Sequence, residues 1–238
     1  MLENDVRLEM QIITVLEHNK CVQRISRRCG FSLTLALAGM NYNAKELAFM
    51  KTQYYTATSL DGFIATEDDS LDWLFPLGNV NETSYPAFID AVGALVMGSA
   101  TYEWMLRHAD KVAAETGSSW PYAQPAWIFS SRELPSIEGA NTHFVKGDVR
   151  PVHTEMRKAA GSKNIWIMGG GDLAGQFLDV GLLDEIIVHI GSVTLWKGKP
   201  LFPRRVTSPP LRLLSVRQVG TGFAELRYEV PRSDTDAT

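Results

Sequence analysis

The chain has 238 residues, of which 45% are hydrophobic and 10% aromatic, and this composition predicts a folded protein with a sizeable core rather than a disordered one. A net charge of −4 and a pI near 5.8 disfavour nucleic acid as a partner, because nucleic-acid-binding domains usually carry a strongly basic patch. No run of about eighteen or more apolar residues occurs, so we expect no membrane-spanning helix and no membrane partner.

Residues 1–49 differ in character from the rest and are predicted to form a poorly ordered extension. Two alternatives remain open: a secretory signal, in which the basic cluster 24–28 precedes the apolar stretch 31–37, or upstream sequence translated before a natural start at Met50. The only cysteines, Cys21 and Cys29, lie in this segment, so the remaining chain can use neither a disulfide nor a thiolate metal site. This use of cysteine predicts a cytoplasmic protein.

From Lys51 onward, short β-rich runs alternate with helical patterns. Strands are predicted at 51–58, 94–97, 126–130, 164–168 and 185–190, and helices at 85–91, 101–108, around Met156 and at 172–180. A hairpin of 211–219 and 223–230 closes a domain that we expect to span 50–232, before a polar tail at 233–238. Single helices between strands predict an α/β fold with a largely parallel sheet, helices on its faces and an antiparallel edge.

The most informative stretch is an apolar strand that runs into Gly169, Gly170 and Gly171 and then into a helix. Glycines let a backbone approach a ligand closely, and a helix N-terminus offers N–H groups and partial positive charge to phosphate. A tight turn that binds nothing would need the same residues. The stretch is neither the spaced glycine fingerprint of dinucleotide-binding folds nor a P-loop.

Several short motifs, in order along the chain, together resemble the dihydrofolate reductase-like family, and its riboflavin-biosynthesis reductase branch in particular. They are residues 56–65 (TATSLDGFIA), 96–103 (VMGSATYE), 130–132 (SSR), 169–171 (GGG), 181–185 (GLLDE) and 198–202 (GKPLF). The resemblance implies a mixed, mostly parallel eight-stranded sheet flanked by helices, with NADPH across the carboxyl ends of central strands. It also implies a homodimer and a small-molecule substrate that is a polar heterocycle or bears a sugar.

The resemblance also implies cofactor-binding residues. The backbone of Ala57 would meet the nicotinamide carboxamide, and Ser131 with Arg132 would bind the adenosine 2′-phosphate, where a guanidinium gives paired charged hydrogen bonds. The matching motifs place the remaining residues near the phosphates: Gly98, Thr101, Gly169, Gly170, Gly171 and Leu173. Thr101 could equally be a simple helix cap, and Arg132 a solvated surface charge.

Chemistry needs a proton source beside the hydride donor, and a carboxylic acid can serve. The candidates are Asp61, in the loop after the first strand, and Glu82, which falls near the helix where dihydrofolate reductases place their substrate-binding acid. His189 is interpreted as a buried core or interface histidine. No His, Cys and acid cluster has metal-ligand spacing, so we expect no metal, and the zinc deaminase motif of the bifunctional riboflavin enzymes is absent.

The sequence departs from the family pattern at three positions. Ser99 replaces a common Arg, which weakens the expected preference for NADPH over NADH, and Ser192 and Trp196 stand where relatives often show Pro and Gly. Trp196 either reshapes the ligand site or packs in the ordinary way. The leading hypothesis is therefore an NADPH-dependent reductase, with a non-catalytic nucleotide-binding protein and a true dihydrofolate reductase as alternatives.

Overall fold

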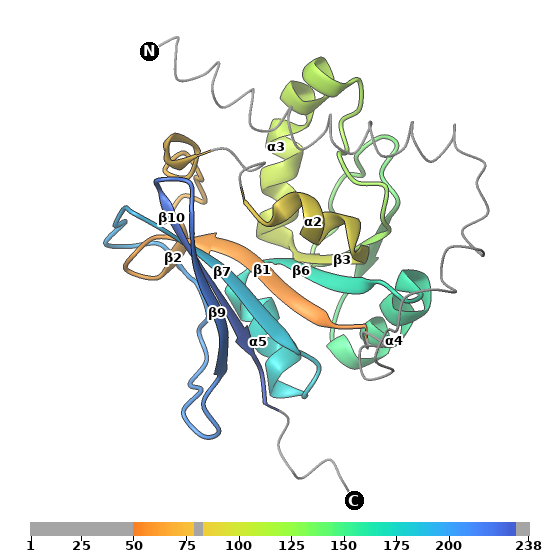
Figure 1. Ribbon diagram of the computed structural model, residues 1–238. Helices are drawn as coiled ribbons and strands as arrows, with labels where there is room; N and C mark the ends of the chain where they lie inside the picture. Colours follow the sequence, from red (N-terminus) through yellow and green to blue (C-terminus); the bar gives the residue numbers. More distant parts are fainter. Residues whose placement is uncertain (1–49, 79–82, 232–238) are drawn as a thin grey trace, which may run out of the picture.

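An eight-stranded sheet forms the centre of the structure, a computed structural model that describes residues 50–78 and 83–231 (Figure 1). In spatial order the strands are β5 (Thr142–Val145), β4 (Ala126–Phe129), β3 (Val92–Gly98), β6 (Asn164–Gly169), β1 (Thr52–Thr58), β7 (Glu185–Gly191), β10 (Phe223–Glu229) and β9 (Arg212–Val219). The six from β5 to β7 pair in parallel, and β10 pairs antiparallel with both β7 and β9. The predicted fold class and terminal hairpin are confirmed.

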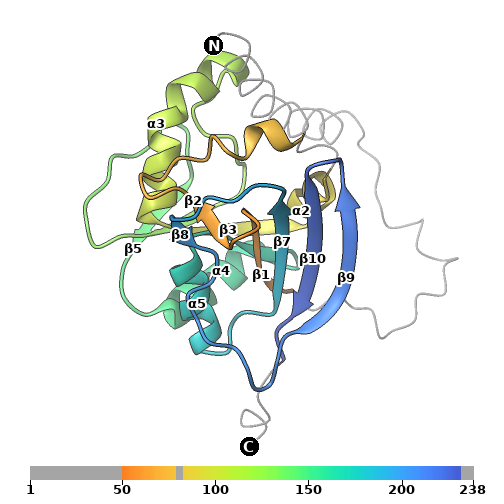
Figure 2. The same ribbon diagram turned by 90° about the vertical axis from the view of Figure 1, so that its left-hand side faces the viewer.

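Helices cover both faces of the sheet (Figures 1 and 2). Helices α2 (Tyr85–Asp90) and α3 (Ser99–Thr116) pack on one face, whereas α4 (Val149–Ala160) and α5 (Gly171–Asp179) pack on the other. A short 3-10 helix, η1 (Phe75–Leu77), follows the loop after β1. α3 is longer than the predicted 101–108, because the chain continues helically until Gly117 adopts a left-handed φ of 74°.

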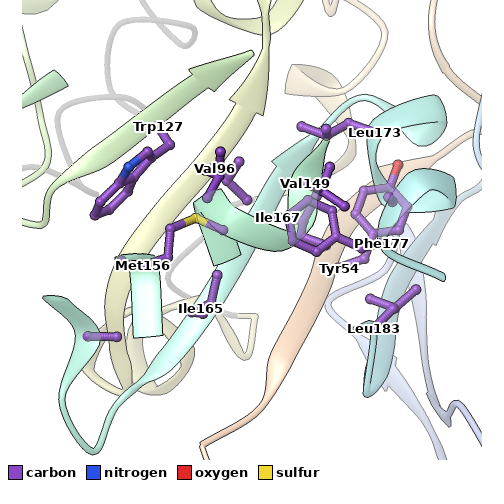
Figure 3. Close-up of a cluster of buried hydrophobic side chains, with 14 of the residues drawn as sticks. Tyr54, Val96, Trp127, Val149, Met156, Ile165, Ile167, Leu173, Phe177 and Leu183 are labelled. Atoms are coloured by element: carbon purple, nitrogen blue, oxygen red, sulfur yellow. The ribbon is translucent and has the colours of Figure 1, made fainter. Parts of the chain in front are cut away.

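The face covered by α4 and α5 holds an aliphatic and aromatic core (Figure 3). Tyr54 of β1 and Ile167 of β6 are fully buried there, and they share one cluster with Met156 of α4 and Phe177 of α5. Removing the ring of a fully buried Phe typically costs about 3–5 kcal/mol, so this cluster contributes strongly to stability. The core fixes α5, and with it the glycine turn that precedes it.

The opposite face is richer in aromatic rings. Tyr55 of β1 stacks on Phe88 of α2 with ring centroids 4.2 Å apart, and Trp166 of β6 meets Phe88 edge-on at 5.4 Å. The indole of Trp166 also donates a hydrogen bond to the carbonyl oxygen of Tyr55 (3.0 Å). These contacts hold α2 against the middle of β1 and β6.

Strands β1 and β6 pair over only part of their length. The β1–β6 register ends at Tyr54, opposite Ile167, whereas β1 stays paired with β7 as far as Thr58. The last residues of β1 therefore have no ladder partner in β6. Two neighbouring parallel strands thus part near their carboxyl ends, which is where a flat ring could reach the backbone of β1.

A small second sheet ties two loops together at the same end of the molecule. Strand β2 (Phe63–Ala65), from the loop after β1, pairs antiparallel with β8 (Lys199–Pro200), from the loop after β7. The backbone N–H of Leu201 adds a hydrogen bond to the carbonyl oxygen of Gly62 (2.8 Å). The sequence predicted neither of these strands, because each is too short to show a hydrophobic period.

Candidate cofactor and substrate site

Two helices begin next to each other at the carboxyl ends of β3 and β6. α3 has Gly98 as its N-cap residue and α5 has Gly170, and neither N-cap position supplies a side-chain hydrogen bond. The two caps are close, since a Cβ built on Gly98 would lie 3.9 Å from the nitrogen of Gly170. The first-turn N–H groups and the positive dipole ends of both helices therefore converge on one place, an arrangement that suits an anion.

The three consecutive glycines have different reasons for lacking a side chain. A Cβ on Gly169 would lie 2.8 Å from Oγ1 of Thr101, and one on Gly171 would lie 2.6 Å from the carbonyl oxygen of Pro200 and closer still to that of Leu201. A Cβ on Gly170 would meet no atom within 4 Å. Packing within the protein therefore explains Gly169 and Gly171, whereas Gly170 borders open space that a ligand can enter.

The other residues predicted to hold phosphate lie around this turn. Thr101 stands in the first turn of α3, with its hydroxyl against Gly169. Leu173 is in α5, but its side chain is only 5% exposed and belongs to the core, so only its backbone N–H can face a ligand. Thus Gly98, Thr101 and Gly170 are brought together by the fold, and Leu173 adds at most a backbone donor.

Ser131 and Arg132 lie in the exposed loop that follows β4. The guanidinium of Arg132 forms an ion pair with Oε1 of Glu103 on α3 (2.9 Å), and its side chain remains 62% exposed. Ser130 shapes the loop, since its hydroxyl accepts from the N–H of Arg132 (3.0 Å) and donates to the carbonyl oxygen of Arg132 (2.7 Å). A phosphate at Arg132 would have to compete with the carboxylate of Glu103. The sequence alone did not indicate this ion pair.

Asp61 connects two loops. Its carboxylate accepts hydrogen bonds from the hydroxyl of Ser59 (2.6 Å), the N–H of Leu195 (3.0 Å) and the N–H of Trp196 (2.6 Å). The hydrogen bond from Ser59, followed by those from the two backbone N–H groups, lowers the pKa of Asp61. An exposed carboxyl that is held ionised is a poor proton donor, so this geometry favours a positioning role, and the catalytic role of Asp61 stays a prediction.

Trp196 is not packed in the ordinary way. Its side chain is 81% exposed, and its φ of 62° lies in the left-handed region that favours glycine. The ammonium group of Lys197 lies 4.9 Å from the centre of the indole ring. This backbone conformation agrees with the expectation that the family pattern has Gly at this position.

The second predicted acid, Glu82, lies outside the described residues, and its role stays a prediction. The described residues nearest to it along the chain lead into α2, whose N-cap residue is Ser84.

A buried polar cluster lies close to Ala57, and the sequence did not reveal it. In the sheet register, Ala57 of β1 is opposite His189 of β7, His189 is opposite Glu225 of β10, and Glu225 is opposite Arg217 of β9. His189 and Glu225 are 4% and 2% exposed, and Nε2 of His189 lies 3.0 Å from Oε2 of Glu225. The burial expected for His189 is confirmed. The only indication of this contact in the sequence was that Glu225, a charged residue, occupies an inward-facing position of β10.

Within residues 50–78 and 83–231, no group of three or more His, Cys, Asp or Glu side chains is arranged to hold a metal ion. Over the same ranges, none of the helices combines the length and the apolar character that crossing a membrane requires.

Comparisons with known proteins agree with this geometry. Residues 51–224 match the family model of the RibD C-terminal domain. The uncharacterized protein YwjB of Bacillus subtilis (strain 168) is 32% identical over 178 residues, which cover 75% of this chain and 97% of YwjB.

Two solved structures are similar in fold. One is a putative riboflavin biosynthesis protein from Shewanella sp. PV-4, with 28% identity, a TM-score of 0.64, and coverage of 77% of this chain and 100% of that chain. Another is dihydrofolate reductase from Enterococcus faecalis complexed with NADP(H), with 16% identity, a TM-score of 0.50, and coverage of 77% and 97%. The dihydrofolate reductase-like fold is thereby confirmed, and the chain belongs to the RibD C-terminal domain family.

Proposed function

We propose that the protein is an NADPH-dependent reductase that transfers hydride to a small polar heterocyclic or sugar-bearing substrate. The observation that carries the proposal is the convergence of two helix N-termini, capped by Gly98 and Gly170, beside the point where β1 and β6 separate. Phosphates at the helix ends and a ring at the free edge of β1 would be held by one continuous surface.

The residues present fit a dinucleotide. The space in front of Gly170 would be filled by any side chain, and Thr101 adds a hydroxyl at the same turn. Ala57 is a small residue in the part of β1 that β6 leaves unpaired, where its backbone can meet a carboxamide. When bound, the cofactor supplies hydride, and the chain has to orient the substrate and provide a proton.

The preference for NADPH over NADH is proposed to be modest. Arg132 is the cation proposed to bind a 2′-phosphate, but it forms an ion pair with Glu103 and is well exposed. Exposed ion pairs contribute about 0–1 kcal/mol, so we expect NADPH to bind only a few times more tightly than NADH.

The test is cofactor binding followed by turnover. Quenching of Trp fluorescence should give dissociation constants for NADPH and NADH, and oxidation of NADPH should then be followed at 340 nm with a panel of ribosylaminopyrimidines, pterins and dihydrofolate. Oxidation with a ribosylaminopyrimidine supports the proposal, and efficient reduction of dihydrofolate would make the protein a dihydrofolate reductase. Tight binding without turnover of any member would point to a nucleotide-binding protein, and absence of binding would refute the assignment.

We further propose that the protein is a homodimer. Edge strand β9 is exposed along nearly its whole length and carries Leu213, Leu214 and Val216, which are exposed aliphatic side chains on an open sheet edge. Such edges are usually covered, because their free backbone groups pair readily with other chains. Sedimentation should give a dimer mass that Val216→Lys reduces to a monomer mass, and a monomeric parent protein would exclude the proposal.

A further inference from the structure

The buried polar cluster described above consists of Tyr55, Ser84, His189, Arg217 and Glu225, and it lies on the sheet face that α2 covers. Nε2 of His189 contacts Oε2 of Glu225 at 3.0 Å and the hydroxyl of Ser84 at 3.5 Å. The hydroxyl of Ser84, at the start of α2, also donates to Glu225 and lies 3.2 Å from the hydroxyl of Tyr55. The cluster therefore joins four strands, β1, β7, β10 and β9, to the N-cap residue of α2.

Glu225 is held as an anion that can support a protonated imidazole. Its Oε1 accepts from Nε of Arg217 (2.8 Å) and its Oε2 from Nη2 of the same residue (3.1 Å). Burial favours the neutral acid, but the hydrogen bonds from Ser84 and Arg217 and the charge of His189 outweigh it, so the pKa of Glu225 lies below its usual value. Arg217 is half exposed, so the cluster reaches solvent at the sheet edge.

His189 is the titratable base of this cluster. Burial lowers the pKa of its imidazole, and the charge of Glu225 opposes this lowering. The ionisable groups that face it are Glu225 from β10, Arg217 from β9 and Tyr55 from β1, with the rings of His189 and Tyr55 5.1 Å apart. Within the described residues the imidazole contacts Glu225 and Ser84 through Nε2, which makes Nδ1 the candidate nitrogen for proton donation.

We propose that His189 donates the proton that accompanies hydride transfer, with Glu225 and Ser84 as positioning residues. This inference rests on the proposed function, because it places the nicotinamide against Ala57, the residue opposite His189 in the register. When bound, NADPH would supply a hydride from its C4–H bond to form the new C–H bond on the substrate carbon. The adjacent nitrogen or oxygen takes the proton from His189, which regains one from solvent along the edge marked by Arg217.

The location distinguishes this cluster from Asp61. The Asp61 carboxylate is exposed and its oxygens are already hydrogen-bonded to the chain, whereas His189 is buried one strand away from the carboxamide position. Paired strands lie about 4.8 Å apart, so the ring of His189 lies within reach of a substrate that stacks on the nicotinamide.

The first test needs no substrate. In protein labelled with ¹⁵N histidine, the titration of His189 is followed by NMR with saturating NADPH and with saturating NADP⁺. Oxidation adds one positive charge to the nicotinamide ring, which disfavours the imidazolium. A unit charge roughly 10 Å away should lower the titration midpoint in the NADP⁺ complex by on the order of 0.5–1 pH unit. The signal is assigned from His189→Gln or, if this variant does not fold, by elimination with variants of the other histidines.

Two matched controls separate this role from a structural one. His153, a buried histidine of α4 on the opposite face, is hydrogen-bonded to the hydroxyl of Thr52 (2.8 Å), and its signal should not respond to the redox state. Glu185 is a buried acid of β7 on the same face as Glu225, paired with Lys51 (3.5 Å) and Arg227 (3.4 Å) at the amino end of the sheet. Glu185→Gln should leave the response of His189 intact, whereas Glu225→Gln should change its midpoint.

Kinetics supply the second test, with any substrate found in the panel. His189→Gln should lower kcat by about 10²–10⁴ with little change in KM or in NADPH affinity, and His153→Gln should leave kcat unchanged. If NADPH does not bind, the proposed function fails. If NADPH binds but His189 gives the same titration in both redox states, or if His189→Gln retains full turnover, the proton-donor role is wrong and the reductase proposal stands.

Discussion

Substitutions at two adjacent glycines should affect different properties, stability at Gly171 and cofactor affinity at Gly170, and this difference tests the cofactor site directly. In Gly171→Ala, the new methyl group would meet the backbone carbonyl oxygens of Pro200 and Leu201, the former at 2.6 Å. Because neither atom belongs to a flexible side chain, the backbone must move, at a cost of roughly 1–3 kcal/mol or more. For a domain of this size each kcal/mol lowers Tm by about 2–4 °C, so we expect a fall of about 2–12 °C.

In Gly170→Ala the methyl group enters open space, and the φ of −91° suits any residue. The loss of a favourable N-cap glycine and the reduced entropy of the unfolded chain nearly offset each other, so Tm should change by less than about 3 °C. NADPH affinity, in contrast, should fall at least about tenfold, equivalent to 1.4 kcal/mol, and Gly170→Val should abolish binding.

Differential scanning fluorimetry and Trp quenching on the same samples measure both effects. Retained NADPH affinity in Gly170→Val would show that the space before α5 is not a phosphate site. A Gly171→Ala variant as stable as the parent would contradict the packing argument instead.

The remaining predictions use other parts of the chain. Arg132→Ala should reduce the ratio of the NADH to the NADPH dissociation constant by about fivefold or less, because Arg132 is exposed and already paired with Glu103. An unchanged ratio would show that Arg132 does not contact the cofactor. Asp61→Asn, which loses an acceptor between two loops, should lower Tm and reduce turnover less than tenfold; a loss of about 10² or more at unchanged Tm would make Asp61 catalytic. A chain beginning at Met50 should match the full chain in Tm and NADPH affinity, and a large fall in either would assign residues 1–49 a structural role. Burial lowers the pKa of His153, so the unfolded state binds more protons below about pH 6.5; Tm should fall on acidification from pH 7.5 to 5.5, and His153→Gln should flatten this slope.

Much of the fold could be predicted because its signals are local. The apolar runs of the central strands and the glycine turn before α5 appear at the expected places, with boundaries that differ by a few residues. Strand β5 was missed because its four residues, Thr142 to Val145, are half exposed at an edge and show no clear alternation. Short pairs such as β2 and β8 depend on contacts between loops distant in sequence, which no local pattern reports.

Only part of the candidate site could be predicted from the sequence, because its remaining contacts join residues that are distant along the chain. A motif places Gly98, Thr101 and Gly170 in the chain, and the fold brings them together. The ion pair of Arg132 with Glu103 and the contact of His189 with Glu225 depend on helix position and strand register, and register is set by the whole sheet. Charge partners therefore had to be learned from the structure.

The unequal surroundings of the three glycines bear on how related sequences should be compared. Gly169 and Gly171 are required by the packing of the protein itself, so a relative that has lost its cofactor would still keep both in order to fold. Gly170 is free of that requirement, and drift to Ala or Ser there would be tolerated as soon as nothing has to fit in front of α5. The middle glycine is thus the position of the triplet at which a ligand, rather than contacts with other parts of the chain, would meet a new side chain, and a change there would point to altered ligand binding.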